Sequence, residues 1–580
     1  MGRFSLNRAR LKDGRAPLLF SAHTTAAAMA ALALAELAQF HHPWWAAMTV
    51  WLVAQPSRGL LIERCLARLA GTAVGALVAG ALLYCFFDSP KTLLILLGIW
   101  LVLCAGIGNL FRHFRNYAWV LAGYSAAIVS LFGLAAPQPN PELATERVAC
   151  TVIGILCSFA VSWLVTPKST SAVPMEEQLE RLVNTGIRWC MSSFSVSGAE
   201  SDACLSRILG MIKALDESFD MTVAGSRSGK RKALHARQII DALIVVLAVI
   251  HERTKDREPA LWIIEFDHRR PGAENLAALI ECVQRTSLRN VEHHQCLTAL
   301  LALHDALKGE RKPVSGWTRA VNHDWRAAGL SAVRPLSALT ITALIWQLTG
   351  WGEGPVMMMT SVLFASLLSS HPNARKAVKD VFTGSLLGGC TGLIARAWLV
   401  PGSENPLLQL LSIAPFLLVG AFFMARPGTA KMAIDLNMTF LLMSQPGAAL
   451  DSSLESLLPQ AMAILLGVLA AAASLLLCQQ THPENTRLAL ARRIAQQTLK
   501  AARSTRPTSA YRRTRHLLVS LVLIDGTPDD LVKAAFSCMA ATAPYCQEGI
   551  FQAPTILEKA SNEARAAAQK LIALTTHSSP

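Results

Sequence analysis

The chain has 580 residues, of which 52% are hydrophobic and only 16% are charged, and its mean hydropathy is +0.37. Soluble domains have about 25% charged residues, so the composition excludes an ordinary soluble enzyme, a disordered chain and a collagen-like protein. Thirteen cysteines without a CxxC pair also exclude a disulfide framework and a zinc ribbon. The net charge of +15 suits either nucleic acid or a membrane surface, and the positions of the charges decide between them.

Apolar segments long enough to cross a membrane, which takes about 17–25 residues, occur in two sets. A basic N-terminus (1–17) leads straight into the first set, so no cleavable signal peptide is expected. The first set, within 18–166, predicts spans at 18–40, 43–57, 66–87, 92–110, 117–136 and 148–166. The second set, within 327–478, predicts spans at 328–350, 354–370, 381–400, 407–425, 432–449 and 457–478.

Two polar regions, 167–326 and 479–580, follow the two sets of spans. Apolar residues recur in both regions with a helical period, which predicts two helical domains. The apolar run Ile239–Ile250 is bracketed by charged residues and is too short for a confident span, so we interpret it as a core helix. The polar regions are expected to pack together, within one chain or across a homodimer or higher oligomer.

The basic residues sort to one side of this layout. Fifteen Lys and Arg residues near the span ends would lie on the side of the N-terminus, against Lys91 and Arg147 alone in the loops on the other side. Basic residues mark the cytoplasmic side, so both termini and both polar regions are predicted to be cytoplasmic. Region 167–326 is nearly neutral, and the cluster Arg512–Arg515 suits lipid headgroups or a solvated helix face. Nucleic-acid binding is therefore not expected.

The two sets of spans look like repeats of each other. A shift of 313 residues sets Gly71 and Gly75 on Gly384 and Gly388. With six spans per half, the repeats share one orientation, and transporters built this way bind substrate between the halves. The predicted fold is an all-α membrane protein with two six-helix transmembrane repeats, each followed by a cytoplasmic helical domain. A shift of 311 residues sets five further pairs on each other: His23 on Arg334, Glu36 on Gln347, Thr49 on Thr360, Arg64 on Arg375 and Arg68 on Lys379.

A local motif carries a family resemblance. It reads Trp44-Trp45-x-x-Met48-Thr49, then Gln55-Pro56, then Arg64-x-x-x-Arg68-x-x-Gly71-Thr72-x-x-Gly75. With the layout of spans and polar regions, this resembles the fusaric acid resistance or aromatic acid exporter family. In the second half, Gly384 follows Lys379 after five residues instead of three. The resemblance implies export of small aromatic carboxylic acids, such as hydroxybenzoate or fusaric acid, across the bacterial inner membrane, often with a periplasmic membrane-fusion adaptor protein.

Cationic and aromatic residues are the candidates for substrate binding. Arg64 and Arg68 share one helical face with the two glycines. They are either anchors at the cytoplasmic surface or a pair that collects a carboxylate there, which suits the bidentate geometry of arginine. Arg375 and Lys379 have the same two interpretations in the second half. Trp44 and Trp45 belong either to a membrane-interface belt or to contacts with an aromatic ring.

Charged residues inside the predicted spans are functional candidates because lipid disfavours them. Arg334 is a candidate for substrate binding, and Arg396 is expected to snorkel towards the surface. Glu36 and His23 are candidates for proton coupling, each against a structural role. Asp435 either joins them or pairs with Lys431, four residues before it.

Other kinds of chemistry find no support in the sequence. Gly225–Lys230 fails the spacing of a phosphate-binding loop, so no ATPase is expected. His293, His294 and Cys296 lack a second ligand pair, so we expect no metal, no cofactor and no catalytic residues. The leading hypothesis is a secondary exporter of aromatic carboxylates, driven by the membrane potential or by proton exchange. An anion channel of the same architecture and a membrane scaffold that recruits a cytoplasmic partner stay open as alternatives.

Overall fold

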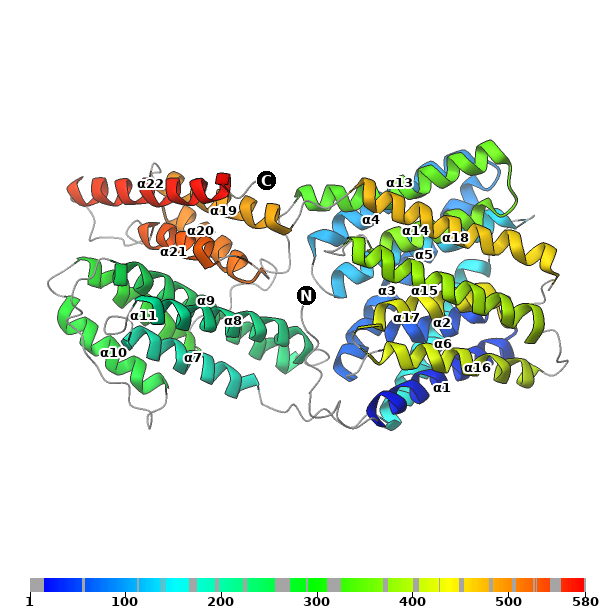
Figure 1. Ribbon diagram of the computed structural model, residues 1–580, viewed down its shortest axis with the longest axis horizontal. Coiled ribbons are helices and arrows are strands. Elements are labelled where there is room, and N and C mark those ends of the chain that lie inside the picture. The colour runs from blue at the N-terminus through cyan, green and yellow to red at the C-terminus, as the bar shows by residue number, and fades with distance from the viewer. Residues whose placement is uncertain are drawn as a thin grey trace. The chain divides into compact units, whose positions relative to one another are not determined.

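The computed structural model is helical wherever it has regular structure among the residues that it describes (Figure 1). This confirms the predicted all-α fold. The chain divides into a membrane unit, Arg3–Thr170 with Trp317–Gln480, and a polar unit, Met1–Gly2 with Ser171–Gly316 and Thr481–Pro580. The described residues are 15–54, 58–111, 114–136, 138, 140, 142–165, 175–192, 198–222, 227–255, 272–287, 291–309, 325–368, 374–399, 406–426, 428–447, 453–478, 483–502, 507–524, 527, 529–542 and 554–577.

The membrane unit has two sets of helices in the same order. The first half contains α1 (Arg15–Leu37), α2 (Trp44–Val53), α3 (Arg58–Phe86), α4 (Pro90–Leu110), α5 (Phe114–Ala135) and α6 (Glu142–Val165). The second half contains α13 (Trp325–Thr349), α14 (Gly354–Leu368), α15 (Ala374–Ile394), the π-helical η1 (Ala395–Leu399), α16 (Pro406–Met424), α17 (Ala430–Ser444) and α18 (Leu454–Leu477).

Seven of these helices are long and apolar enough to cross a membrane, by length and composition alone: α1, α3, α4, α5, α6, α13 and α18. The predicted span 43–57 forms the helix α2 of only ten residues, about 15 Å at 1.5 Å per residue. Its counterpart α14 has 15 residues, about 22 Å. Both are shorter than the roughly 30 Å hydrocarbon layer of a bilayer, so neither could cross it alone.

Equivalent helix pairs pack in the two halves. Helix α3 contacts α5 as α15 contacts α17, and α2 contacts α6 as α14 contacts α18. Helix α4 of the first half contacts α13 of the second, as α16 of the second contacts α1 of the first. These matching contacts, in which each half reaches the other in the same way, support the predicted internal repeat.

Small residues set the register of the repeat. Gly71 and Gly75 of α3 lie against the backbone of Ala118 and Ala122 in α5. In the second half, Gly384 and Gly388 of α15 lie against the backbone of α17 in the same way. Glycine at these positions lets the helix backbones approach each other closely. The packing therefore confirms the shift of 313 residues between α3 and α15.

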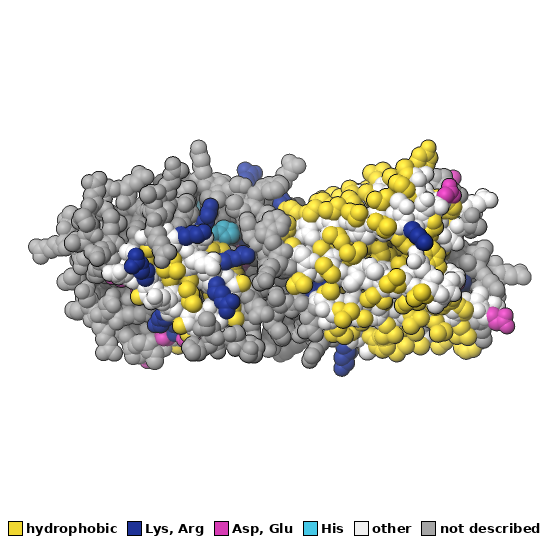
Figure 2. Space-filling view, turned by 90° about the horizontal axis from the view of Figure 1, so that it is seen from above, with side chains coloured by type: hydrophobic (Ala, Val, Ile, Leu, Met, Phe, Trp, Pro, Cys, Tyr) yellow, Lys and Arg dark blue, Asp and Glu magenta, His cyan; other side chains and the backbone are white. Residues whose placement is uncertain are grey.

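The short helices lie in the interior of the membrane unit. Every residue of α2 is buried, as are most residues of α14 and α17. Large apolar side chains are exposed instead on surrounding helices, for example Leu77, Ile95 and Leu348. Figure 2 shows hydrophobic side chains covering one face of this unit. An apolar surface of this extent fits contact with lipid, and it leaves α2 and α14 enclosed by protein.

The polar unit has a hydrophobic core of its own. Leu205 of α8, Leu243 of α9 and Phe536 of α21 belong to one buried cluster. Lys533 donates a hydrogen bond to Asp202 at 2.6 Å and so joins α21 to α8, so the segments before and after the second membrane half form one unit. Its helices are α7 (Met175–Ser192), α8 (Gly198–Thr222), α9 (Arg227–Lys255), α10 (Gly272–Ser287), α11 (Val291–Lys308), α19 (Pro483–Ala501), α20 (Pro507–Val522), α21 (Asp529–Thr542) and α22 (Pro554–His577).

Helix α9 shows why hydropathy alone is not sufficient. Its segment Arg231–Glu252 is long and apolar enough to be counted as a membrane span. However, the residues Ile239–Ile250 pack in the core of the polar unit, where only Asp241 is not fully buried. The interpretation of this run as a core helix is therefore confirmed.

Candidate functional site

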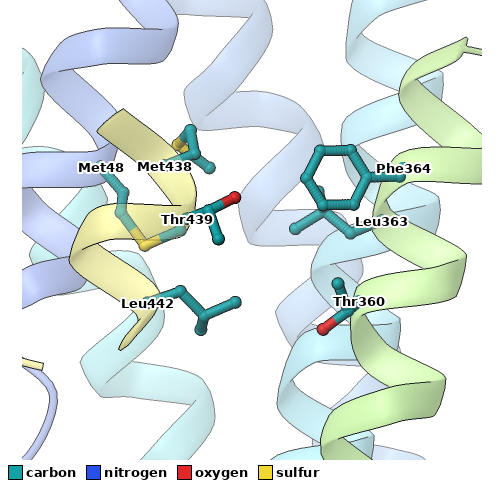
Figure 3. Close-up of a pocket in the computed structure, with 7 residues that line it drawn as sticks. All are labelled: Met48, Thr360, Leu363, Phe364, Met438, Thr439 and Leu442. Atoms are coloured by element: carbon teal, nitrogen blue, oxygen red, sulfur yellow. The ribbon is translucent and has the colours of Figure 1, made fainter. Parts of the chain in front are cut away.

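A small cavity lies between the two halves of the membrane unit (Figure 3). Its volume is about 10 Å³, roughly what one water molecule needs. The cavity is too small for an aromatic acid. It is lined by Met48 of α2, by Thr360, Leu363 and Phe364 of α14, and by Met438, Thr439 and Leu442 of α17.

The position of the cavity makes it a candidate transport site. It lies between α2 and α14, which are unusually short and occupy corresponding places in the two halves. In transporters with internal repeats, such paired short segments are the best sequence-level indication of the binding site. Thr439 adds a buried hydroxyl that has no hydrogen-bond partner within the described part of the chain. The other lining side chains are apolar apart from Thr360.

Arg68 lies fully buried on α3 and is bonded to α2. Its Nη1 donates a hydrogen bond to the hydroxyl of Tyr124 at 2.9 Å, and its Nη2 donates one to Thr49 at 3.2 Å. Thr49 follows Met48, which lines the cavity. Among the described residues, no ion pair with a carboxylate is formed by Arg68. The guanidinium is thus held by neutral partners inside the bundle, and not at an exposed surface.

Arg64 lies one turn earlier on the same helix and is only half-buried. Its guanidinium lies over the ring of Tyr117, 5.0 Å from the ring centroid. The two arginines predicted as a pair therefore have different surroundings. Arg64 reaches solvent or headgroups, whereas Arg68 does not.

Arg147 is a buried cation that the sequence interpretation misplaced. We expected it in a loop outside the membrane, but α6 begins at Glu142, so Arg147 lies in the second turn of the helix and is fully buried. Its guanidinium lies 4.9 Å from the centroid of the Trp45 ring. Its Nε and Nη1 are buried and have no hydrogen-bond partner within the described part of the chain. Its place directly before the apolar run 148–166 was the only signal in the sequence.

Trp44 and Trp45 are fully buried in the core of the membrane unit. The ring of Trp45 meets that of Phe132 edge-on, with the centroids 5.6 Å apart. Because neither tryptophan is exposed, the interpretation as a membrane-interface belt is wrong for this structure. The burial leaves the other interpretation, contact with an aromatic ligand, as a prediction.

His42 and Glu146 form a link between the loop before α2 and the helix α6. The backbone N–H of His42 donates to one carboxylate oxygen of Glu146, and the His42 Nδ1 lies 3.2 Å from the other oxygen. Glu146 is thereby engaged by His42 although it precedes Arg147 in the chain. No sequence pattern indicated this pairing, because the two residues are 104 positions apart.

The three proton-coupling candidates lie apart from one another. His23 is half-buried within α1, and Glu36, in the last turn of the same helix, lies beside Gly447. Asp435 is buried on α17, in the neighbourhood of Asp380 and Lys431. In the part of the chain that is described, no hydrogen bond or ion pair joins any two of the three.

Arg334 on α13 has a structural partner. Its Nε and Nη2 donate to the carbonyl oxygen of Cys478, at 3.1 and 3.0 Å. That carbonyl follows directly after α18, where helix carbonyl groups lack partners within the helix. Arg334 therefore caps the end of α18 in this structure.

The second half does not repeat the arginine pair. The register set by Gly71 and Gly384 places Val381, not Lys379, at the position of Arg68. The alignment of Arg68 with Lys379 is therefore wrong, and Lys379 is exposed. The reason is that the shift changes from 311 to 313 residues between α14 and α15. Several residues singled out in the sequence lie outside the described residues, wholly or in their side chains: Gln55, Pro56, Gly225, Lys230, His293, His294, Arg375 and Arg512.

Arg396 of η1 is buried and bonded. Its Nη1 donates to the carbonyl oxygen of Met443 at 3.2 Å and to the side-chain oxygen of Gln460 at 2.9 Å. The expectation that it would snorkel to the surface is wrong, because these acceptors hold it inside the bundle.

Comparisons with known proteins agree with this architecture. Residues 17–288 and 266–577 each match the fusaric acid resistance protein family. A p-hydroxybenzoic acid efflux pump subunit AaeB from Edwardsiella tarda (strain FL6-60) is 25% identical and covers 89% of this chain and 84% of its own length. Subunits of the same name from Pectobacterium carotovorum subsp. carotovorum (strain PC1) and Musicola paradisiaca (strain Ech703) are 23% and 22% identical. They cover 85% and 89% of this chain and 80% and 84% of their own lengths.

No solved structure matches the chain. The two family matches together span nearly all of it, one for each half, in agreement with the repeat seen in the helix packing. The long apolar helices and the efflux-pump relatives identify a multi-pass membrane transport protein and not an enzyme. The chain belongs to the fusaric acid resistance protein family.

Proposed function

We propose that the protein exports small aromatic carboxylic acids, such as p-hydroxybenzoate, across the bacterial inner membrane. The observation that carries the proposal is the cavity between the short, repeat-related helices α2 and α14, together with the buried cation Arg68, which is bonded to Thr49 of α2. The apolar lining suits an aromatic ring, and a guanidinium suits a carboxylate. The efflux-pump names of the relatives support this substrate class.

The proposed route begins on the cytoplasmic side. The distribution of basic residues supports cytoplasmic termini and a cytoplasmic polar unit. Arg64, Arg375 and Lys379 would attract the anion at that surface. Arg68 would meet it inside the bundle, between the halves. Because the cavity is too small for an aromatic acid, the halves would have to move apart to admit the substrate.

The membrane potential can drive this export without ATP. An aromatic acid is an anion at neutral pH, and the interior of the cell is electrically negative. Moving one negative charge outward is favoured by about 2.3 kcal/mol per 100 mV, which corresponds to roughly a fifty-fold concentration ratio. Proton exchange would add to this driving force, with Glu36, His23 and Asp435 as the candidate carriers.

The relatives are named as subunits of a pump, which supports a further component. We expect a periplasmic membrane-fusion adaptor protein to continue the route beyond the inner membrane, and a homodimer or higher oligomer of this chain to fit the same assembly.

The export of radiolabelled p-hydroxybenzoate tests the proposal. Cells with and without the chain are loaded with the label and compared when energised and when de-energised. We expect energy-dependent loss of label only where the chain is present. If loss is the same with and without the chain across a panel of aromatic acids, with expression confirmed, the substrate class is wrong.

A further inference from the structure

Two arginine side chains are buried in the first half of the membrane unit without an acidic partner. Arg68 and Arg147 are 0% and 1% exposed. Neither forms an ion pair among the described residues, and the Nε of each has no hydrogen-bond partner there. Removing a charged group from water is unfavourable unless it is paired. The pair is therefore a feature that packing alone does not account for.

The two cations influence each other directly. Arg68 and Arg147 lie near enough to each other for their charges to repel, and Tyr124 lies near both. Tyr124 accepts a hydrogen bond from Arg68. The Nη1 and Nε of Arg147 are buried and have no hydrogen-bond partner within the described part of the chain. The nearest carboxylate in sequence, Glu146, is bonded to His42. Two like charges thus share one interior region, and an anion there would relieve their repulsion.

An aromatic surface adjoins the unsatisfied donors. The ring of Trp45 lies under the Arg147 guanidinium at 4.9 Å and packs against His42 and Phe132. A carboxylate can accept paired hydrogen bonds from a guanidinium, and an aromatic ring packs favourably in offset or edge-on contact with other rings. The guanidinium donors match the carboxylate of a small aromatic acid, and the neighbouring rings match its aromatic ring.

The second half provides an internal comparison. Gly154 of α6 contacts Thr49 of α2 as Gly467 of α18 contacts Thr360 of α14, which fixes the helix register. In that register, neutral residues occupy the four places equivalent to the two arginines, Trp45 and Tyr124. The second half therefore folds without a cation at either arginine position. The residues equivalent to Arg68, Arg147, Trp45 and Tyr124 are Val381, Gln460, Val356 and Met438.

From these observations we infer that Arg147 and Arg68, with Trp45 and Tyr124, form an internal binding site for an aromatic carboxylate in the first half alone. The inference rests on the proposed function and makes it specific: the carboxylate binds between the two guanidinium groups, and the ring packs against Trp45. The transport path is then asymmetric, because the second half has no equivalent of these four residues, and its buried Arg396 is already bonded to Met443 and Gln460.

The first test varies the ligand and leaves the protein unchanged. The full chain is purified into lipid nanodiscs, and the binding of p-hydroxybenzoate and of its neutral amide, p-hydroxybenzamide, is measured by titration calorimetry. The amide has the same ring but no charge, so we expect its Kd to be at least tenfold higher. Equal affinity for the acid and the amide would overturn the inference, because a site between two guanidinium groups must discriminate charge.

The second test varies the protein. R147Q introduces the residue found at the equivalent place in the second half, and we expect it to raise the Kd for p-hydroxybenzoate about 10- to 100-fold. R147K keeps the charge without the bidentate geometry, so its Kd should lie between those of R147Q and the parent. R396Q is the matched control, because Arg396 is a buried arginine of the second half whose bonds are satisfied. Its Kd should stay within about twofold.

The possible outcomes distinguish failure of the inferred binding site from failure of the proposed function. If the parent binds and exports p-hydroxybenzoate while folded R147Q has an unchanged Kd and KM, the site is wrong and the proposed function stands. If the parent neither binds nor exports any aromatic acid, the proposed function itself fails. Should R147Q not fold, the comparison of acid with amide on the parent still decides whether the site recognises charge.

Discussion

The ring of His42 stacks on the ring of Trp45, with centroids 4.4 Å apart and planes inclined by 11°. The same histidine is bonded through its backbone and its ring to Glu146. His42 therefore joins the start of α2, the ring beneath Arg147 and the start of α6. Since α2 is only ten residues long and lacks a side-chain cap, this junction is an important determinant of its position.

Loss of the Glu146 carboxylate is expected to loosen this junction. E146Q keeps the size of the side chain but weakens two hydrogen bonds, which we expect to lower the stability of the membrane unit by about 1–3 kcal/mol. The change is measured as a lower Tm of the purified chain in detergent. H41A is the control, since His41 is exposed, and its Tm should equal that of the parent. An unchanged Tm for E146Q would show that the junction does not stabilise the fold.

Transport is expected to require the buried guanidinium of Arg68. R68Q removes a charge that bonds to Tyr124 and Thr49, so kcat/KM for p-hydroxybenzoate export should fall by about 10- to 100-fold. R115Q changes an exposed arginine of the same half and should leave export nearly unchanged. Both rates are normalised to the amount of chain in the membrane. Export by R68Q at the rate of the parent would remove Arg68 from the site.

The glycine contacts between α15 and α17 leave no room for a methyl group, so alanine there is expected to destabilise the fold. In G388A, the new Cβ would meet the backbone of Leu436 and Phe440, which forces α15 and α17 apart. We expect loss of folded protein or destabilisation of more than about 2 kcal/mol. G329A is the matched control, because nothing lies within 4 Å of the position where its Cβ would be, and alanine favours the helix. Size-exclusion profiles and Tm compare the two; equal profiles would contradict the packing.

Cys538 in the polar unit is expected to be inert and to make stability sensitive to alkaline pH. Burial raises its pKa from 9.0 to about 12, so the folded state holds the thiol proton where the unfolded chain releases it. The contribution of this thiol to stability is full below about pH 9 and is lost as pH rises towards 12. C538A should therefore show less loss of stability over this interval than the parent. Maleimide labelling at pH 8 should modify the half-exposed Cys204 and spare Cys538.

Periodic and compositional features of the fold could be predicted from the sequence. The helices, the repeat and the core helix at Ile239–Ile250 follow from apolar periodicity and glycine spacing, which are local properties. The site could be predicted only in part. Arg68 was found because it shares a face with Gly71 and Gly75. Arg147 was missed because the start of α6, and not hydropathy, decides whether it is in a loop or in the bundle.

Side-chain partners were the least predictable feature. The pairing of His42 with Glu146 joins residues 104 positions apart, and no local pattern encodes it. The cap that Arg334 forms on Cys478 spans 144 positions, and its charge had suggested substrate binding instead. Lys379 was wrongly aligned with Arg68 because the shift of 311 residues was applied to α15 as well as to α14. The connection between these helices differs in length between the halves, so the shift changes to 313 residues in α15.

The polar unit has a core whose parts are made at different times. Helices α7 to α11 end at Lys308, and their core partners in α19 to α22 begin only at Pro483, after the second half of the membrane unit. At about 5–20 residues per second, the ribosome needs roughly 10–35 s to make the intervening chain. During that interval the apolar surface that α21 will cover has no partner from its own chain. Completion of this core thus follows synthesis of every membrane helix, and a chain truncated within the second half would expose that surface to chaperones and proteases.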